Sequence, residues 1–175
     1  MIEAINYDEL YFSPDTRRLK QLCWCSLSIS IILLGLFLFF GLQAGGFEFR
    51  AEVISFIAMH IIDILLAVVV LQLINDARLN RTPSIKKQFA YLFMVYLALF
   101  SLVIHLDLLY TLYKSFRWLY MAAAFLNFSK AVFPFFILSI LLLNTLLIPL
   151  VQISSFKFVK KLRRAGEVQI TGIDE

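Results

Sequence analysis

Residues 31–40 read IILLGLFLFF, ten successive positions without a polar side chain. They lie inside a longer apolar stretch that extends from about Gln21 to Leu42. A helix that crosses the hydrocarbon core needs about 20 apolar residues, because the core is roughly 30 Å thick and a helix rises about 1.5 Å per residue. This stretch therefore predicts a transmembrane helix.

Three further stretches of the same kind follow, at about residues 53–74, 89–111 and 131–153. The whole chain of 175 residues is 61% hydrophobic and only 16% charged, with a mean hydropathy of +0.85. A soluble domain carries about 25% charged residues, so this composition excludes a soluble globular or disordered protein. Period-two alternation is absent, and open strands would leave unpaired edges in lipid. We expect an all-α integral membrane protein, a single domain of four transmembrane helices in an up-and-down bundle.

The distribution of Lys and Arg predicts the orientation of the four spans. The segment before the first span, the loop between the second and third, and the segment after the fourth together carry 12 of the 16 Lys and Arg residues. Cytoplasmic segments of membrane proteins are enriched in these residues. We therefore expect both termini in the cytoplasm, and a multi-pass protein of the bacterial plasma (inner) membrane.

The segment 154–175 is expected to form a basic cytoplasmic tail. Each cation near an anionic leaflet contributes about 1 kcal/mol of attraction, so five side chains are candidates for contact with lipid headgroups. The alternative is that they only fix the topology. Since the basic residues are divided among segments next to the membrane, we expect no nucleic-acid partner, and contacts with the bilayer and with other membrane-protein subunits instead. The five candidates are Lys157, Lys160, Lys161, Arg163 and Arg164.

The connection between the third and fourth spans includes YKSFRWLYMAAAFLNFSK at residues 113–130. Its apolar part is too short to span the bilayer, and aromatic residues beside cations are typical of the membrane–water interface. This pattern predicts a short interfacial helix, with a plain loop as the alternative. In the loop before the third span, Ser84 follows Pro83 and is positioned to cap an early helix start.

Ionisable residues inside the spans are the most informative feature of the sequence. A charge at the bilayer centre costs at least about 2.5–3.5 kcal/mol, so such residues usually face a partner or a cavity. His60 lies about 10 Å and His105 about 9 Å below the same predicted surface. His60 and Asp63 share a helix face, as do Ser101 and His105. We expect these four to form a polar cluster, while Asp107 points elsewhere and extends outward.

Three interpretations of this cluster remain open. It is a buried clasp between two helices, a path for protons, ions or small molecules, or a haem site with His60 and His105 as axial ligands. The sequence does not identify a metal, and it names no cofactor beyond the haem alternative. HExxH, GxSxG, P-loop and EF-hand patterns are absent, so no catalytic residue is assigned.

Other polar or small residues of the spans are expected to serve packing. Asn144 falls near mid-membrane and should form a hydrogen bond with a neighbouring helix, while Ser26, Ser30 and Gly35 should allow close helix approach. These observations favour a non-enzymatic accessory, assembly or regulatory subunit that acts through contacts within the membrane. The alternative is a transport protein or a haem-linked redox component that uses the His/Asp cluster.

Overall fold

The computed structural model describes residues 7–43, 51–123 and 129–171, and the side chains of these ranges except 40–43, 51–53, 112, 115–123, 129–138 and 166–171. These residues form five helices: α1 (Tyr7–Phe12), α2 (Pro14–Gln43), α3 (Ala51–Arg78), α4 (Ile85–Ala123) and α5 (Ser129–Thr171). Four of them are long and apolar enough to cross a membrane, over Pro14–Phe39, Ile54–Arg78, Ile85–Thr111 and Ser139–Ala165. The predicted fold class, four transmembrane helices in an up-and-down bundle, is confirmed.

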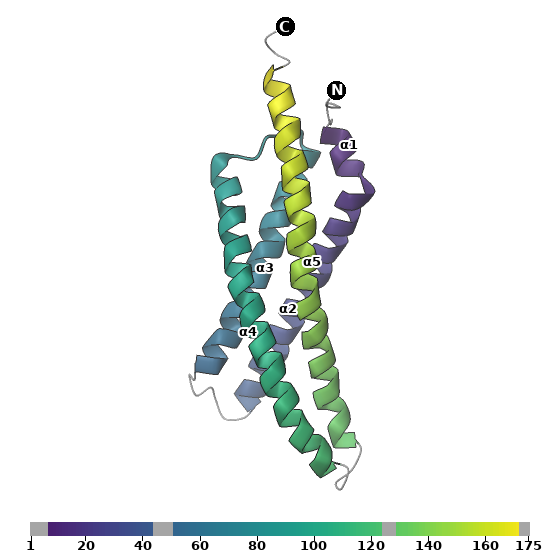
Figure 1. Cartoon of the computed structure of the whole chain (residues 1–175), viewed down its shortest axis with the longest axis vertical. Coiled ribbons are helices and arrows are strands. Elements are labelled where there is room, and N and C mark those ends of the chain that lie inside the picture. Colours follow the sequence, from purple (N-terminus) through teal and green to yellow (C-terminus); the bar gives the residue numbers. More distant parts are fainter. Residues whose placement is uncertain (1–6, 44–50, 124–128, 172–175) are drawn as a thin grey trace.

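The four long helices pack side by side in alternating directions (Figure 1). Helix α2 contacts α3, α3 contacts α4, α4 contacts α5, and α5 contacts α2, so the bundle closes on itself. As a result α1 and the end of α5 lie at the same end of the bundle. Which side of a membrane this end faces stays a prediction from the Lys and Arg distribution.

The bundle interior is apolar over most of its length. Its main cluster extends from Leu19 and Cys23 of α2 through Val70 of α3 to Val151 and Phe158 of α5. Many large apolar side chains point outward on all four long helices, which is the pattern expected of a surface in lipid. Cys23 is buried whereas Cys25 is exposed, since residues two apart on a helix point in nearly opposite directions.

A short helix, α1, precedes the first span and was not anticipated from the sequence. Its Tyr7 and Leu10 are buried against the bundle. The chain then turns at Ser13, where the hydroxyls of Ser13 and Thr16 donate hydrogen bonds to the Leu10 carbonyl at 2.8 and 2.7 Å. These bonds add to the one that Ser13 N donates to the same carbonyl at 3.4 Å, and together they close the end of α1.

The turn between α3 and α4 follows local rules. Asn80 adopts φ 51°, and Arg81 N donates to the Asp76 carbonyl at 3.0 Å, an arrangement that commonly ends helices. The Ser84 hydroxyl accepts a bond from Lys87 N at 3.4 Å, so the predicted cap is confirmed. Lys87 Nζ also donates to both carboxylate oxygens of Asp76, at 2.7 and 2.8 Å, and joins the two helices.

The helices are longer than the predicted spans. Helix α4 continues to Ala123, so residues 113–123 extend it and do not form the separate interfacial helix that we considered, while residues 124–128 lie outside the described part. No Pro or Gly interrupts residues 85–123, and the end is rich in helix-forming Leu, Met and Ala. The expected tail from residue 154 is likewise helical as far as Thr171. At Gly35 no atom of the described residues lies within 4 Å of an added Cβ, so the expected close approach is not found among them.

Candidate functional site

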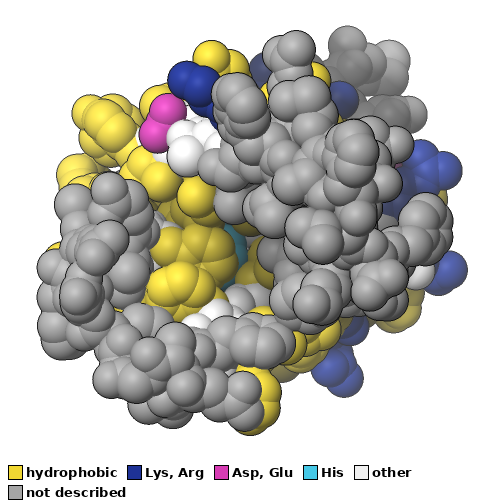
Figure 2. Space-filling model, turned by 90° about the horizontal axis from the view of Figure 1, so that it is seen from below, with side chains coloured by type: hydrophobic (Ala, Val, Ile, Leu, Met, Phe, Trp, Pro, Cys, Tyr) yellow, Lys and Arg dark blue, Asp and Glu magenta, His cyan; other side chains and the backbone are white. Residues whose placement is uncertain are grey.

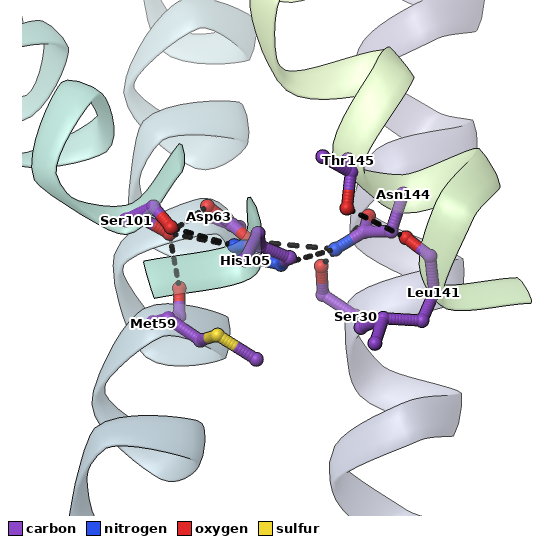
Figure 3. Close-up of polar contacts among 8 residues, drawn as sticks. All are labelled: Ser30, Met59, Asp63, Ser101, His105, Leu141, Asn144 and Thr145. Carbon is purple, nitrogen blue, oxygen red and sulfur yellow. Dashed lines mark hydrogen bonds and ion pairs between the residues drawn. The ribbon is translucent and has the colours of Figure 1, made fainter. Parts of the chain in front are cut away.

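A buried polar cluster joins all four long helices at one level of the bundle (Figure 3). Each of its residues is between 0% and 2% exposed. Since most of the surrounding core is hydrophobic, this cluster is the principal polar feature of the described interior. We define the four-helix cluster as Ser30 of α2, His60 and Asp63 of α3, Ser101 and His105 of α4, and Asn144 of α5.

Helical spacing places these residues on inward faces. His60 and Asp63 lie three residues apart on α3, and Ser101 and His105 lie four apart on α4, so each pair faces the same neighbour. The structure brings together the four residues that the sequence grouped. Asp107 lies outside this group and is exposed on α4.

Asp63 is held by hydrogen-bond donors from two other helices. Ser101 Oγ donates to Asp63 Oδ1 at 3.0 Å, and Asn144 Nδ2 donates to Asp63 Oδ2 at 3.3 Å. His105 Nε2 lies 3.4 Å from the same Oδ2 atom. No Lys or Arg of the described chain pairs with this buried carboxylate.

The backbone of α4 orients the His105 ring. Its Nδ1 lies 2.8 Å from the Ser101 carbonyl oxygen, which can only accept, so the proton on Nδ1 is the donor. The ring then presents Nε2 toward Asp63 and toward Asn144 Nδ2, which lies 3.2 Å away. Metal-binding histidines are commonly oriented in this way, with one nitrogen bound to a carbonyl and the other free to act as a ligand.

Asn144 and Ser30 extend the cluster beyond the predicted group. Asn144 Nδ2 contacts both Asp63 and His105, and Ser30 Oγ donates to Asn144 Oδ1 at 3.5 Å. The hydrogen bond expected of Asn144 with a neighbouring helix is present. Its connection to Asp63 and His105 was not predicted. Sequence spacing shows which residues share a face of one helix, but it does not show how α5 is rotated toward α3 and α4.

His60 differs from the other members because neither ring nitrogen has a hydrogen-bond partner among the described residues. The side chain is nevertheless fully buried. Its ring stacks on that of His105, with centroids 5.5 Å apart and planes 25° apart, and its centroid lies 4.4 Å from that of the Phe56 ring. A buried polar group without a partner costs about 1–3 kcal/mol, so the fold retains His60 at a cost in stability.

His60, Asp63 and His105 can together hold a metal ion. One ligand atom from each lies within 4.8 Å of the others, and all three side chains are buried. Two imidazoles and one carboxylate form a common ligand set for divalent transition metals. Ligand atoms around a tetrahedral zinc ion lie about 3.4 Å apart, so ion binding requires these atoms to move closer together by up to about 1.4 Å.

The arrangement does not fit the haem alternative. A haem with two axial histidines lies as a flat porphyrin between them, and each ring directs a nitrogen at the iron. Here the rings of His60 and His105 stack face to face, and His105 Nε2 is in contact with Asp63 and Asn144. No space for a porphyrin separates the two histidines.

The five predicted headgroup contacts lie on the part of α5 nearest the termini. Lys161 forms an ion pair with Asp15 of α2, with 2.9 Å between Nζ and Oδ2. Lys157 and Lys161 also line a pocket between α2 and α5, while Lys160, Arg163 and Arg164 are exposed elsewhere on the helix. Their contact with lipid stays a prediction.

Comparison with known proteins assigns no family to this chain. No protein-family model matches it, and no curated protein or solved structure is significantly similar to it. The functional argument therefore depends on the geometry of the four-helix cluster.

Proposed function

We propose that this membrane protein transports a divalent transition-metal cation, and that His60, Asp63 and His105 form its binding site within the bundle. The observation that carries the proposal is the contact between His105 Nε2 and Asp63 Oδ2 at 3.4 Å. With its proton on Nδ1, the His105 ring presents a lone pair at Nε2, and the ionised carboxylate offers another. Two acceptors at this distance are compatible when a cation lies between them.

His60 favours a metal ion over a proton as that cation. A proton shared by Asp63 and His105 would satisfy that pair but would leave both nitrogens of His60 without a partner. A metal ion bound by all three side chains would give a nitrogen of His60 a ligand role and would offset the buried negative charge of Asp63. It therefore accounts for all three residues at once.

The position of the cluster near one end of the bundle supports transport. Seen from the end opposite the termini, a histidine is visible deep between hydrophobic side chains (Figure 2). Helical rise places His60 about 9 Å from the start of the candidate span at Ile54. An ion could approach the cluster from this end after losing part of its hydration shell.

A second candidate function is a non-enzymatic accessory or assembly subunit. It is supported by the large share of the described chain within the four candidate spans. In that case the cluster would act as a clasp, and Asp63→Asn would preserve function because an amide can still form hydrogen bonds. The unpartnered nitrogens of His60 favour the cation site over the clasp.

The test uses purified protein in liposomes that contain a fluorescent zinc indicator. We expect the wild type to bind about one Zn²⁺ or Co²⁺ per chain and to admit external Zn²⁺, whereas Asp63→Asn should lose both properties. Asp107→Asn is the matched control, because it removes an exposed carboxylate from a candidate span and should behave as wild type. Absence of bound metal, or equal effects of the two variants, would contradict the cation site and leave the accessory role.

A further inference from the structure

We propose that the pocket between the start of α2 and the distal part of α5 binds the phosphate headgroup of an anionic phospholipid. The pocket has a volume of about 240 Å³ and is lined by residues of α1, α2 and α5. Helix α1 and the end of α5 lie at the same end of the bundle (Figure 1). The pocket shares no residue with the four-helix cluster, so this inference is independent of the proposed transport function.

The pocket carries a net positive charge. Arg18 of α2 and Lys157 and Lys161 of α5 line it, together with one carboxylate, that of Asp15. Asp15 pairs with Lys161 at 2.9 Å, and no carboxylate of the described chain forms an ion pair with Arg18 or Lys157. Two cations from two different helices are therefore available to one anionic group.

The pocket also supplies donors suited to phosphate oxygens. The Lys161 ammonium has three N–H groups, and its bond to Asp15 fixes its position while leaving further donors. Ser154 adds a hydroxyl on the adjacent turn of α5, and the Arg18 guanidinium matches the geometry of phosphate. The buried ring of Phe158 forms part of the lining.

The depth of the pocket corresponds to the headgroup region. Lys20 is the last charged residue of α2, and residues 21–47 carry none. On α5 the first charge of the same end is Lys157, after an uncharged stretch over residues 131–156. The pocket therefore lies where both helices change from charged to apolar, which is the boundary between headgroups and hydrocarbon.

The apolar surface beyond this boundary favours a lipid over free phosphate. Ile153 and Phe156 of α5 are 56% and 60% exposed, respectively. Each lies on a helix that lines the pocket, on the apolar side of its cations. A phospholipid can place its phosphate among the cations of the pocket and its acyl chains along these apolar side chains. A soluble phosphate would contact only the cations.

The test measures thermal unfolding of delipidated full-length protein in a zwitterionic detergent. Phosphatidylglycerol at about one hundred times its dissociation constant should raise the unfolding midpoint by about 5–10 °C, whereas phosphatidylcholine and soluble glycerol phosphate should not. The double variant Arg18→Gln/Lys157→Gln should bind phosphatidylglycerol about thirtyfold more weakly. The matched control Arg17→Gln/Lys160→Gln removes the same charge from exposed positions on the same helices and should bind as wild type.

Three outcomes would overturn the proposal. If both double variants bind phosphatidylglycerol equally weakly, the attraction comes from the overall positive charge of this end of the bundle and not from the pocket. Equal stabilisation by glycerol phosphate would identify a soluble anion as the ligand, and an equal shift with zwitterionic phosphatidylcholine would show that the net negative charge of the headgroup is not recognised. The unfolding midpoint of each variant without added lipid verifies that the variant folds. Zinc binding at the four-helix cluster should be the same in all of them, which separates this test from that of the proposed function.

Discussion

Asn144 Nδ2 lies 3.2 Å from His105 Nε2 and thereby connects α5 to α4 within the hydrophobic interior. The same amide donates to Asp63 of α3 and accepts from Ser30 of α2. One side chain thus reaches all three other long helices. Such a residue should affect both the stability of the bundle and the position of the ligand atoms.

Replacement of Asn144 by Leu should destabilise the protein by about 1–3 kcal/mol. A hydrogen bond between membrane helices contributes only about 0.6 kcal/mol on average, but this change also removes a donor from the buried Asp63. Thr145→Val is the comparison, since that hydroxyl bonds only the Leu141 carbonyl of its own helix at 2.8 Å. Unfolding in mixed micelles measures the free energy of unfolding of both variants. An equal or larger loss in Thr145→Val would refute the proposed contribution of Asn144 to the stability of the bundle.

His60 and His105 should respond differently to replacement by Phe. Because the nitrogens of His60 lack partners, His60→Phe should leave the free energy of unfolding of the metal-free protein unchanged or increased. His105→Phe should lower it by about 1–3 kcal/mol, because Ser101 and Asn144 lose a partner. Both variants should lose zinc affinity, measured by isothermal titration calorimetry. Zinc binding retained by His60→Phe would remove that residue from the site.

The ion pair between Asp76 and Lys87 should contribute more to stability than that between Asp15 and Lys161. The side chain of Asp76 is 10% exposed and that of Asp15 is 72% exposed. Lys87→Met would leave a largely buried carboxylate unpaired and should cost about 1–3 kcal/mol. Lys161→Met should cost less than about 1 kcal/mol, because water screens exposed pairs. Chemical unfolding measures the loss of stability in each variant. A larger loss in Lys161→Met than in Lys87→Met would contradict the prediction.

Docking of α1 should weaken at high pH. Burial raises the pKa of Tyr7, whose hydroxyl has no hydrogen-bond partner among the described residues. The stabilisation from docking is therefore complete below the ordinary pKa of tyrosine, near 10, and decreases as the pH rises through the higher folded value. Spin labels at Glu9 and Lys160, in a chain whose native cysteines have been replaced, should show a broader distance distribution above this folded pKa than at neutral pH. Tyr7→Phe should abolish this pH dependence, and persistence of the change would assign it to another group.

The orientation can be tested with single cysteines and an impermeant maleimide on intact cells. We expect Arg81→Cys and Lys160→Cys to react only after permeabilisation, because their segments belong to the Lys- and Arg-rich side. Glu48→Cys, in the connection between α2 and α3, should react from outside. External labelling at Arg81 would show that the topology is the reverse of the predicted one.

The sequence by itself determined the four spans. A run of about 20 apolar residues must become a helix in lipid, because each backbone polar group has to be satisfied within its own segment. Spacing within one helix also grouped His60 with Asp63 and Ser101 with His105, since residues three or four apart share a face. The α1 helix was missed because six residues carry too little periodicity to indicate a helix.

Only the tertiary structure decided what each face meets. The long helices are apolar around most of their circumference, so the sequence contains little signal for their rotation, and packing of the whole bundle fixes it. This rotation brings Asn144 to His105 and leaves His60 without a partner. At the other end it places Arg18 of α2 and Lys157 of α5 in one pocket, although 138 positions separate them in the chain. Contacts between distant segments depend on the relative depth and rotation of two helices. The span boundaries indicate the depth approximately, but the spacing within one helix does not give its rotation against another.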